Sequence, residues 1–247
     1  MLIAIDIGNS RIKIGIMNNS GNIIEKSVIN TEKQKANFNP ALNLISSNKS
    51  NINSCIICSV VPELNNQTKE FIKSAAGIEP VFIQSHASNG LKYIYHNPEN
   101  IGPDRIANVL GATSISGAPV VVVDFGTATT VSISLNENEF SGGLIAPGVE
   151  TSFYALNIKS SKLPMTDLEN TPDLIGHSTL ECIQSGVYNM QSGFVVSILS
   201  RLKKEYPDIK TFCSGGFAHH FKQHFDYHES SLVLIGCFEY LKLLDGK

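Results

Sequence analysis

The stretch IAIDIGNSRIKIGI, residues 3–16, places a short polar segment between two runs of β-branched residues. The two runs predict strands over residues 2–7 and 12–17, joined as a hairpin. An isolated Asp-x-Gly turn most often closes on itself, because the Asp side chain bonds nearby backbone N–H groups. On this hairpin alone, a purely structural role is therefore the expected one for Asp6.

The same turn has a second interpretation, in which it holds phosphate. Successive backbone N–H groups around Gly8 and Asn9 can cradle phosphate oxygens. Asp6, at a strand end, can hold a hydrated Mg²⁺. Lys13, on the strand that leaves the turn, can reach the same phosphates.

A second stretch repeats this plan and decides between the two interpretations. VVVVDFGTATT, residues 120–130, combines an apolar run with Asp124, a glycine and several hydroxyl side chains. Apolar alternation resumes at Ile12 in the first repeat and at Val131, one residue later in register, in the second. Two such turns at corresponding positions indicate a duplication and favour phosphate binding.

The duplication predicts an α/β protein of two domains, residues 1–117 and 118–247, with the boundary near Gly117–Pro119. Further strands are predicted over 27–33, 55–61, 80–83 and 210–216. Helices are predicted over 63–77, 103–116, 149–159, 178–204 and 231–244, with another starting near residue 217. Residues 34–54 show only a weak helical pattern, and 84–100 are predicted as a loop or irregular strand.

Composition limits the partners of the chain. It has 247 residues, of which 42% are hydrophobic and 17% charged, and its formal net charge is -3. Such a chain can bury a sizeable core, and it carries no basic field that would attract nucleic acid or an anionic membrane surface. Small molecules are therefore the expected partners.

The sequence also predicts a cytoplasmic protein. No apolar run approaches the roughly 18 to 20 residues of a membrane helix, and the first twenty residues lack signal-peptide features. The five cysteines are an odd number and lie mostly in apolar surroundings, where reduced core thiols are expected. Cys55 and Cys58 form a CxxC pair, but inside a predicted buried strand and without a second pair at zinc spacing.

Three further motifs complete an ordered set: YHNPENIGPDR at 95–105, GGLIAPG at 142–148 and SGGFA at 214–218. The two glycines of the last motif expose bare backbone that can lie against an adenine or ribose. With the two turns, these motifs closely resemble the type III pantothenate kinase family across nearly the whole chain. The resemblance implies two ribonuclease-H-like domains of the actin-like ATPase type, each a mixed five-stranded sheet flanked by helices. It also implies synthesis of 4'-phosphopantothenate from ATP and pantothenate, the first step of coenzyme A synthesis.

The resemblance implies a role for each matching residue. The implied ATP-binding residues are Asp6, Ile7, Gly8, Asn9, Ser10, Arg11, Ile12, Lys13, Thr127, Gly215 and Gly216. The implied pantothenate-binding residues are Tyr95, Gly102, Pro103, Asp104, Arg105 and Thr179, the last supplied across a homodimer interface. Asp104 corresponds to the catalytic base, Asp6 to a residue near the Mg²⁺ of ATP, and Asp124 to the ligand of a monovalent cation, K⁺ or NH₄⁺. Ser10 and Ser214 stand where the family usually has threonine, and residues 185–194 match less clearly.

These residue types suit the implied chemistry. In-line phosphoryl transfer needs charge neutralisation at the phosphates and an acceptor hydroxyl held in line. Asp104 can take the proton of a primary alcohol, and Arg105 offers a fork for a carboxylate or a phosphate. A phosphohydrolase on the same fold and a non-catalytic regulator that binds nucleotide or pantothenate remain the alternatives.

A histidine cluster follows the last motif. His220, His224 and His228 recur at intervals of four residues, and His219 adjoins them. A helix beginning near 217 would place three imidazoles on one face, an arrangement that can bind a transition metal. Because no carboxylate occupies a matching position, solvated histidines are the expected alternative. His96, beside Tyr95, is a candidate for lining the substrate pocket.

Overall fold

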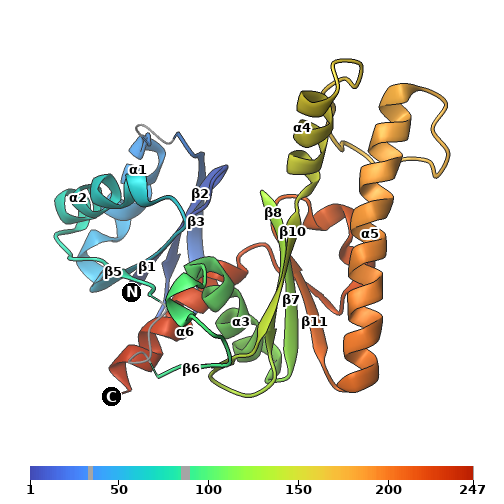
Figure 1. The fold of residues 1–247 in the computed structure, drawn as a ribbon. Helices are drawn as coiled ribbons and strands as arrows, with labels where there is room; N and C mark the ends of the chain where they lie inside the picture. The colour runs from blue at the N-terminus through green and yellow to red at the C-terminus, as the bar shows by residue number, and fades with distance from the viewer. Residues whose placement is uncertain (33–35, 85–89, 247) are drawn as a thin grey trace. The chain divides into compact units, whose positions relative to one another are not determined.

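The computed structural model describes residues 1–32, 36–84 and 90–246, which form two compact units (Figure 1). The first unit contains Met1–Gly117, Asn136–Ser141 and Ser231–Lys247, and the second contains Ala118–Leu135 and Gly142–Ser230. The chain first crosses between the units after Gly117. The units differ from the predicted continuous domains in two segments, because 136–141 and 231–247 pack with the first unit.

The first unit is built on a five-stranded mixed sheet in the order β3-β2-β1-β4-β5. Its central strand β1 pairs antiparallel with β2 and parallel with β4. The strands are β1 (Leu2–Ile7), β2 (Arg11–Met17), β3 (Ile23–Asn30), β4 (Ser54–Ser59) and β5 (Val81–Phe82). The helices of this unit are α1 (Asn39–Asn48), α2 (Asn65–Ala76), α3 (Pro103–Ser116) and α6 (Leu232–Asp245).

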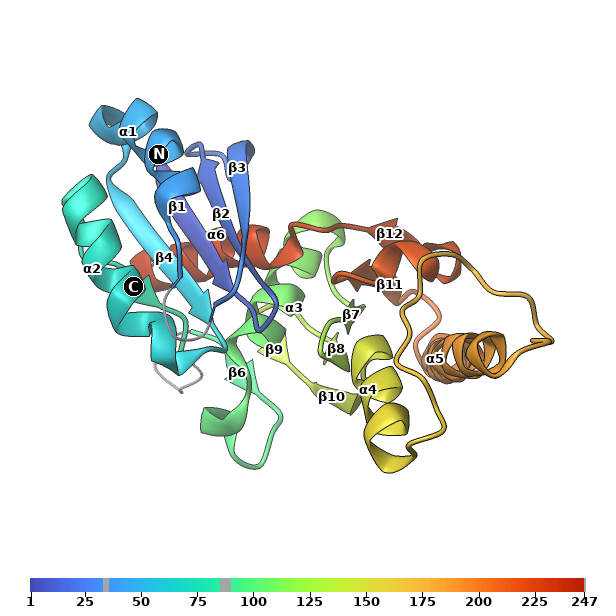
Figure 2. The ribbon, with the colours of Figure 1, turned by 90° about the horizontal axis from the view of Figure 1, so that it is seen from above.

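Helices cover both faces of this sheet (Figures 1 and 2). Successive side chains of a strand point to opposite faces. Ile3, Ile5 and Ile7 of β1 therefore pack with α1 and α2, whereas Leu2 and Ala4 pack with α3 and α6. This explains why β1 is apolar on both faces until Asp6.

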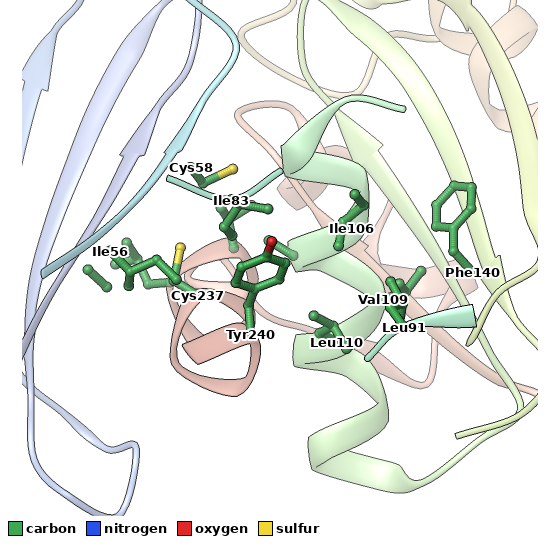
Figure 3. Close-up of a cluster of buried hydrophobic side chains, with 14 of the residues drawn as sticks. Ile56, Cys58, Ile83, Leu91, Ile106, Val109, Leu110, Phe140, Cys237 and Tyr240 are labelled. Atoms are coloured by element: carbon green, nitrogen blue, oxygen red, sulfur yellow. The ribbon is translucent and has the colours of Figure 1, made fainter. Parts of the chain in front are cut away.

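The second of these cores is shown in Figure 3, where side chains of β4, α3 and α6 interlock. Tyr240 of α6 is 1% exposed, and its hydroxyl donates to the carbonyl of Gln84 at 2.9 Å. Two glycines allow α3 and α6 to touch through their backbones. A methyl group on Gly236 would overlap the Ala107 carbonyl, and one on Gly111 would come within 2.5 Å of the Leu232 carbonyl oxygen.

The second unit repeats the topology of the first. Its sheet has the order β10-β8-β7-β11-β12, in which β7 pairs antiparallel with β8 and parallel with β11. The strands are β7 (Val120–Phe125), β8 (Ala128–Ser134), β10 (Gly142–Pro147), β11 (Lys210–Ser214) and β12 (Tyr227–His228). Helices α4 (Val149–Lys159) and α5 (Thr179–Glu205) pack on one face, against Val121, Val123 and Phe125 of β7.

Short elements connect the two sheets' main strands and helices. The short strands β6 (Lys92–Tyr93) and β9 (Glu139–Phe140) pair in parallel. The 3-10 turns are η1 (Lys49–Asn51), η2 (Pro62–Leu64), η3 (Pro98–Asn100), η4 (Ala218–His220) and η5 (Lys222–His224). None of the helices in the described ranges is long and apolar enough to cross a membrane.

The predicted helices over 103–116 and 149–159 are confirmed to the residue. Gly77 ends α2 with φ of +76°, as a left-handed cap requires. The third strand begins at Ile23, earlier than predicted, because polar residues mask its alternation; Lys33, at its predicted end, lies outside the described residues. Of the predicted loop 84–100, residues 85–89 also lie outside them, and the remainder includes β6 and η3.

Candidate active site

The first hairpin turn is held in a fixed shape by its own backbone. Gly8 N–H donates to the Arg11 carbonyl at 3.0 Å, and the hydroxyl of Thr31 donates to the Gly8 carbonyl at 2.7 Å. The N–H group of Gly8 is therefore used within the turn itself, and its predicted part in a phosphate cradle stays a prediction. Asn9 and Ser10 are exposed, and their N–H groups make no hydrogen bond within the described part of the chain. These two donors are the ones that face outward from the turn.

Asp6 and Lys13 form the charged part of this turn. They are cross-strand partners in the β1–β2 register, and Lys13 Nζ lies 3.6 Å from Asp6 Oδ2. Asp6 is only 9% exposed. By strand alternation both side chains lie on the sheet face that carries α3 and α6.

Helix α3 presents Asp104 at its first turn. Gly102 is the N-cap and Pro103 occupies the first helical position, where a missing N–H group costs nothing. Asp104 Oδ1 accepts from the backbone N–H of Arg105 at 2.9 Å, which fixes the carboxylate against the helix end. A side chain at Gly102 would come within 2.5 Å of this oxygen and would displace the Asp104 carboxylate from this position.

Arg105 and Tyr95 meet through an aromatic ring that the sequence motifs do not include. The Arg105 guanidinium carbon lies 5.2 Å from the ring centroid of Phe140, and the Tyr95 ring packs edge-on against the same ring at 5.9 Å. Arg105 is buried, at 4% exposure, whereas Tyr95 is 39% exposed. The arrangement places a buried cation beside a partly exposed aromatic side chain.

A pocket of about 630 Å³ opens beside this cluster. It is lined by Ile94, Tyr95, His96, Asn97 and Asn100. His96 lies in the wall of this pocket, and its predicted part in a substrate site stays a prediction. The size is within the range of small-molecule sites, and its walls combine apolar surface with amide and imidazole groups.

Glu139 supports this region from β9. It is 4% exposed and accepts from Lys92 Nζ at 2.9 Å, from Ser141 Oγ at 2.7 Å and from Asn136 Nδ2 at 3.2 Å. The hydrogen bond from Ser141 and those from Lys92 and Asn136 lower the pKa of this carboxyl group. Glu139 thereby anchors the strand that carries Phe140.

The second hairpin turn carries Asp124 and Thr127. Asp124, half-buried at the end of β7, pairs with Thr130, and Thr127 is exposed at the tip. The Thr127 carbonyl accepts from the Thr151 hydroxyl at 2.5 Å and from Gly148 N–H at 3.2 Å. This turn is therefore tied to the first turn of α4.

The predicted register of this hairpin is wrong. The innermost pair of the first hairpin is Ile7–Ile12, with residues 8–11 between them, and that of the second is Phe125–Thr129, with residues 126–128 between them. The second turn is thus shorter by one residue. The prediction failed because the buried position after the turn holds Thr129 rather than an apolar residue.

The SGG segment follows β11 and lies against the second turn. Gly215 has φ of +96°, and any side chain there would come within 2.6 Å of the Phe125 backbone. An added Cβ on Gly216 would meet no atom within 4 Å, so its surface is open. Ser214 pairs with Asp124 in the parallel register, and its buried hydroxyl has no hydrogen-bond partner among the described residues.

Thr179 begins α5, in the second unit. Ser178 caps this helix by accepting from Glu181 N–H at 3.2 Å, and Glu181 accepts from His177 N–H at 2.7 Å. The hydrogen bond from His177 N–H, together with the hydrogen bond from Ser178, lowers the pKa of the Glu181 carboxyl group. Thr179 is exposed just beyond the cap.

The histidine segment does not form the predicted helix. It forms the turns η4 and η5 and the strand β12, so His220, His224 and His228 do not share a helix face. Three hydrophobic rings, Phe217, Phe221 and Phe225, draw this segment into the core instead. Within the described residues, no group of three metal-ligating side chains is gathered.

Sequence comparison decides the family. A sequence model described as type III pantothenate kinase matches residues 2–201. The type III pantothenate kinase of a Sulfurihydrogenibium species is 34% identical over 212 residues, covering 83% of this chain and 84% of the relative. That of Streptomyces griseus is 31% identical over 256 residues, covering 96% of each. The chain belongs to the type III pantothenate kinase family.

Solved structures place this pantothenate kinase family member among actin-like ATPase folds. A Baf family transcriptional activator from Campylobacter jejuni superposes with a TM-score of 0.61 at 17% identity, covering 99% of this chain and 100% of that one. A ROK family glucokinase from Streptomyces griseus, solved with glucose and AMPPNP, gives 0.53 at 10% identity, covering 100% and 99%. At these identities the likeness concerns the fold, and it confirms the predicted fold class.

Each unit of this pantothenate kinase family member gathers one group of predicted residues. The first holds the turn at 6–13, Tyr95 and the segment 102–105, and the second holds Asp124, Thr127, the glycines of SGG and Thr179. Sequence reasoning missed the supporting residues Thr31, Phe140 and Thr151. None of them carries a local signal, because each acts through a contact with a residue distant in the chain.

Proposed function

We propose that this chain transfers the γ-phosphoryl group of ATP to the primary hydroxyl of pantothenate. The family supplies the reaction. Three observations support it for these residues: Asp104 and Arg105 begin one helix, Arg105 packs on the Phe140 ring that also contacts Tyr95, and Tyr95 lines a pocket. Pantothenate has a carboxylate at one end, a primary alcohol at the other and apolar carbon between them. A buried arginine, a carboxylate base and an aromatic wall suit those three features.

Asp104 is the proposed general base. Its bond from Arg105 N–H fixes the carboxylate, so that it can accept the proton as the hydroxyl oxygen bonds to the γ-phosphorus and ADP leaves. Arg105 is the proposed partner of the pantothenate carboxylate, because a guanidinium fork binds carboxylates in a bidentate manner.

The two turns are proposed to hold the nucleotide and its cations. The outward N–H groups of Asn9 and Ser10 and the ammonium of Lys13 are suited to phosphate oxygens. Asp6 offers the hard carboxylate oxygens that Mg²⁺ prefers, and Asp124 is the proposed ligand of K⁺ or NH₄⁺. When bound, these ions neutralise charge on the phosphates. The open backbone at Gly216 suits the adenosine end.

A homodimer is also proposed, with Thr179 reaching the partner's pantothenate. The second unit exposes large apolar side chains at the tip of α4 and in the loop before α5, the region where Thr179 lies. These are Tyr154 at 57%, Ile158 at 58%, Leu174 at 76% and Ile175 at 69%. Exposed apolar groups of this size support an interface. Light scattering of Ile158→Asp against wild type tests it, since an unchanged mass would contradict the proposal.

A cytoplasmic location is proposed on the state of the cysteines. All five are free thiols, and four of them are buried. Burial raises the pKa of the Cys213 thiol to about 12, which leaves it unreactive. Reduced thiols are typical of a cytoplasmic protein.

ADP release with ATP, pantothenate, Mg²⁺ and K⁺ tests the reaction. Asp104→Asn is expected to keep the fold and nucleotide binding and to lower kcat by roughly 10²- to 10⁴-fold. Asp208→Asn, at an exposed carboxylate far along the chain, is the matched control and keeps full activity. Absence of pantothenate-dependent turnover in the wild type refutes the proposal, and phosphate release that ignores pantothenate indicates a hydrolase instead.

A further inference from the structure

Gln191 lies in the segment 185–194, to which neither the motifs nor the proposed chemistry gives a role. It is 2% exposed on α5. Its Oε1 accepts from the Thr129 hydroxyl at 2.9 Å, and its Nε2 donates to the Pro147 carbonyl at 2.6 Å. One side chain thus joins the helix to the start of β8 and the end of β10.

The contacts of Gln191 fall on β8, which leaves the second turn, and on β10, whose last residue Pro147 pairs with Ala128 at the end of that turn. Thr129 follows the turn directly, two residues after Thr127. Pro147 precedes Gly148, whose N–H bonds the Thr127 carbonyl. Gln191 therefore fixes the two backbone segments between which Thr127 is held.

The duplication shows that this polar contact is not needed to build the hairpin. The position of Thr129 corresponds to Ile12 in the first hairpin, where an apolar side chain packs opposite Ile7. A buried threonine there requires a partner, and Gln191 provides it. Thr129 points toward α5, whereas Asp124 and Thr130 point to the opposite face. The Gln191 amide therefore supports the turn from the sheet face that carries α5, and it does not contact a ligand bound at the opposite face.

We propose that Gln191 is a positioning residue for nucleotide binding, acting through Thr129 and Pro147 on the turn that carries Thr127. The inference rests on the proposed function in one respect, the contact of this turn with ATP. A neutral amide is required because it combines one acceptor with one donor. Glutamate at 191 could still accept from Thr129 but could not donate to Pro147, and leucine could do neither.

The test measures the Kd of a non-hydrolysable ATP analogue with Mg²⁺ by calorimetry, together with steady-state kinetics. Gln191→Leu is expected to weaken analogue binding by about 10-fold. This is the lower end of the range for losing a residue that orients a binding group without touching the ligand. Gln191→Glu is expected to weaken analogue binding as well, because its buried carboxylate would face the Pro147 carbonyl without a donor. The KM for pantothenate is expected to stay within about 2-fold of wild type in both variants. Gln184→Leu is the matched control, since Gln184 lies on the same helix and bonds Thr166 and the Asp167 carbonyl instead.

Thr129→Val tests whether the effect of Gln191 passes through Thr129. It conserves side-chain volume, so it also serves as the test if Gln191→Leu folds poorly. The double variant should bind the analogue no more weakly than Gln191→Leu, because both changes remove one shared hydrogen bond. Wild-type affinity in Gln191→Leu, equal losses in Gln184→Leu, or additive losses in the double variant would overturn the inference. Analogue affinity needs no acceptor, so a wild type without pantothenate-dependent turnover would refute the proposed function and leave this comparison valid.

Discussion

Gly236→Ala tests whether the backbone contact of α3 and α6 holds the first unit together. The added methyl group would overlap the Ala107 carbonyl and come within 2.7 Å of the Ala107 Cα, where ordinary contacts begin at 3.4 Å. Backbone atoms cannot rotate away, so the two helices must move apart. That separation weakens the packing of Leu234, Cys237 and Tyr240 against their neighbours; each of these side chains is at most 1% exposed.

We expect Gly236→Ala to lower the free energy of unfolding by about 2 to 4 kcal/mol. Because the clash is with backbone atoms, the cost of overpacking exceeds the usual 1 to 3 kcal/mol and is about 3 to 5 kcal/mol, of which the gain of helix propensity from alanine returns about 1 kcal/mol. For a chain of this size each kcal/mol shifts Tm by roughly 2 to 4 °C, so Tm should fall by about 4 to 16 °C. Gly193→Ala is the control, because an added Cβ there meets no atom within 4 Å and helix propensity alone acts. Thermal unfolding followed by circular dichroism measures both variants, and an equal or higher Tm for Gly236→Ala would refute the reasoning.

Three further predictions concern the residues around the site. Because hydrogen bonds from Ser141 and its neighbours lower the pKa of Glu139 below its ordinary value of 4.5, its carboxylate stabilises the fold above that pH. Glu139→Gln should therefore unfold at a lower urea concentration than the wild type at pH 7. The difference between the two urea midpoints should shrink as the pH falls below about 4.5, the ordinary pKa of this group; a difference independent of pH would contradict this. Thr31→Val and Thr151→Val each remove a hydroxyl that holds a turn carbonyl, and steady-state kinetics should show a KM for ATP raised about 5-fold with the KM for pantothenate unchanged. Arg105→Lys should raise the KM for pantothenate by about 10-fold without changing that for ATP, since lysine lacks the planar fork; equal changes in both would argue against a carboxylate contact.

The sequence predicts those elements whose signals are local. Pro103 and Gly117 bracket α3, and four consecutive valines identify the buried strand β7. The ends of β3 are less accurate, because solvent-facing polar residues interrupt its pattern. The histidine segment fails for a different reason. Histidines and phenylalanines both recur there at helical spacing, but the segment forms two 3-10 turns and then the strand β12, which pairs with β11, a long-range pairing that no local pattern shows.

Much of the candidate site is likewise visible in the sequence, but its support is not. Asp104 and Arg105 stand out as a motif, and the structure places them at a helix start as predicted. Phe140, which packs against Arg105, comes from a polar stretch with no comparable signal. It reaches the site because 136–141 packs with the first unit, a return of the chain that no local pattern encodes.

The two hairpins share a scaffold but differ where chemistry is proposed, and the difference supports giving them separate tasks. Both place an aspartate one residue before the innermost pair of the hairpin. Opposite Asp6 stands Lys13, whose fixed ammonium suits a turn that must neutralise phosphate charge. Opposite Asp124 stands Thr130, so the strand pair supplies a hydroxyl instead of a cation. A carboxylate flanked by oxygen donors attracts a cation from solution, which favours the monovalent ion at the second turn and the phosphate-bound Mg²⁺ at the first. The two turns therefore occupy corresponding positions, and the residue opposite each aspartate distinguishes their proposed uses.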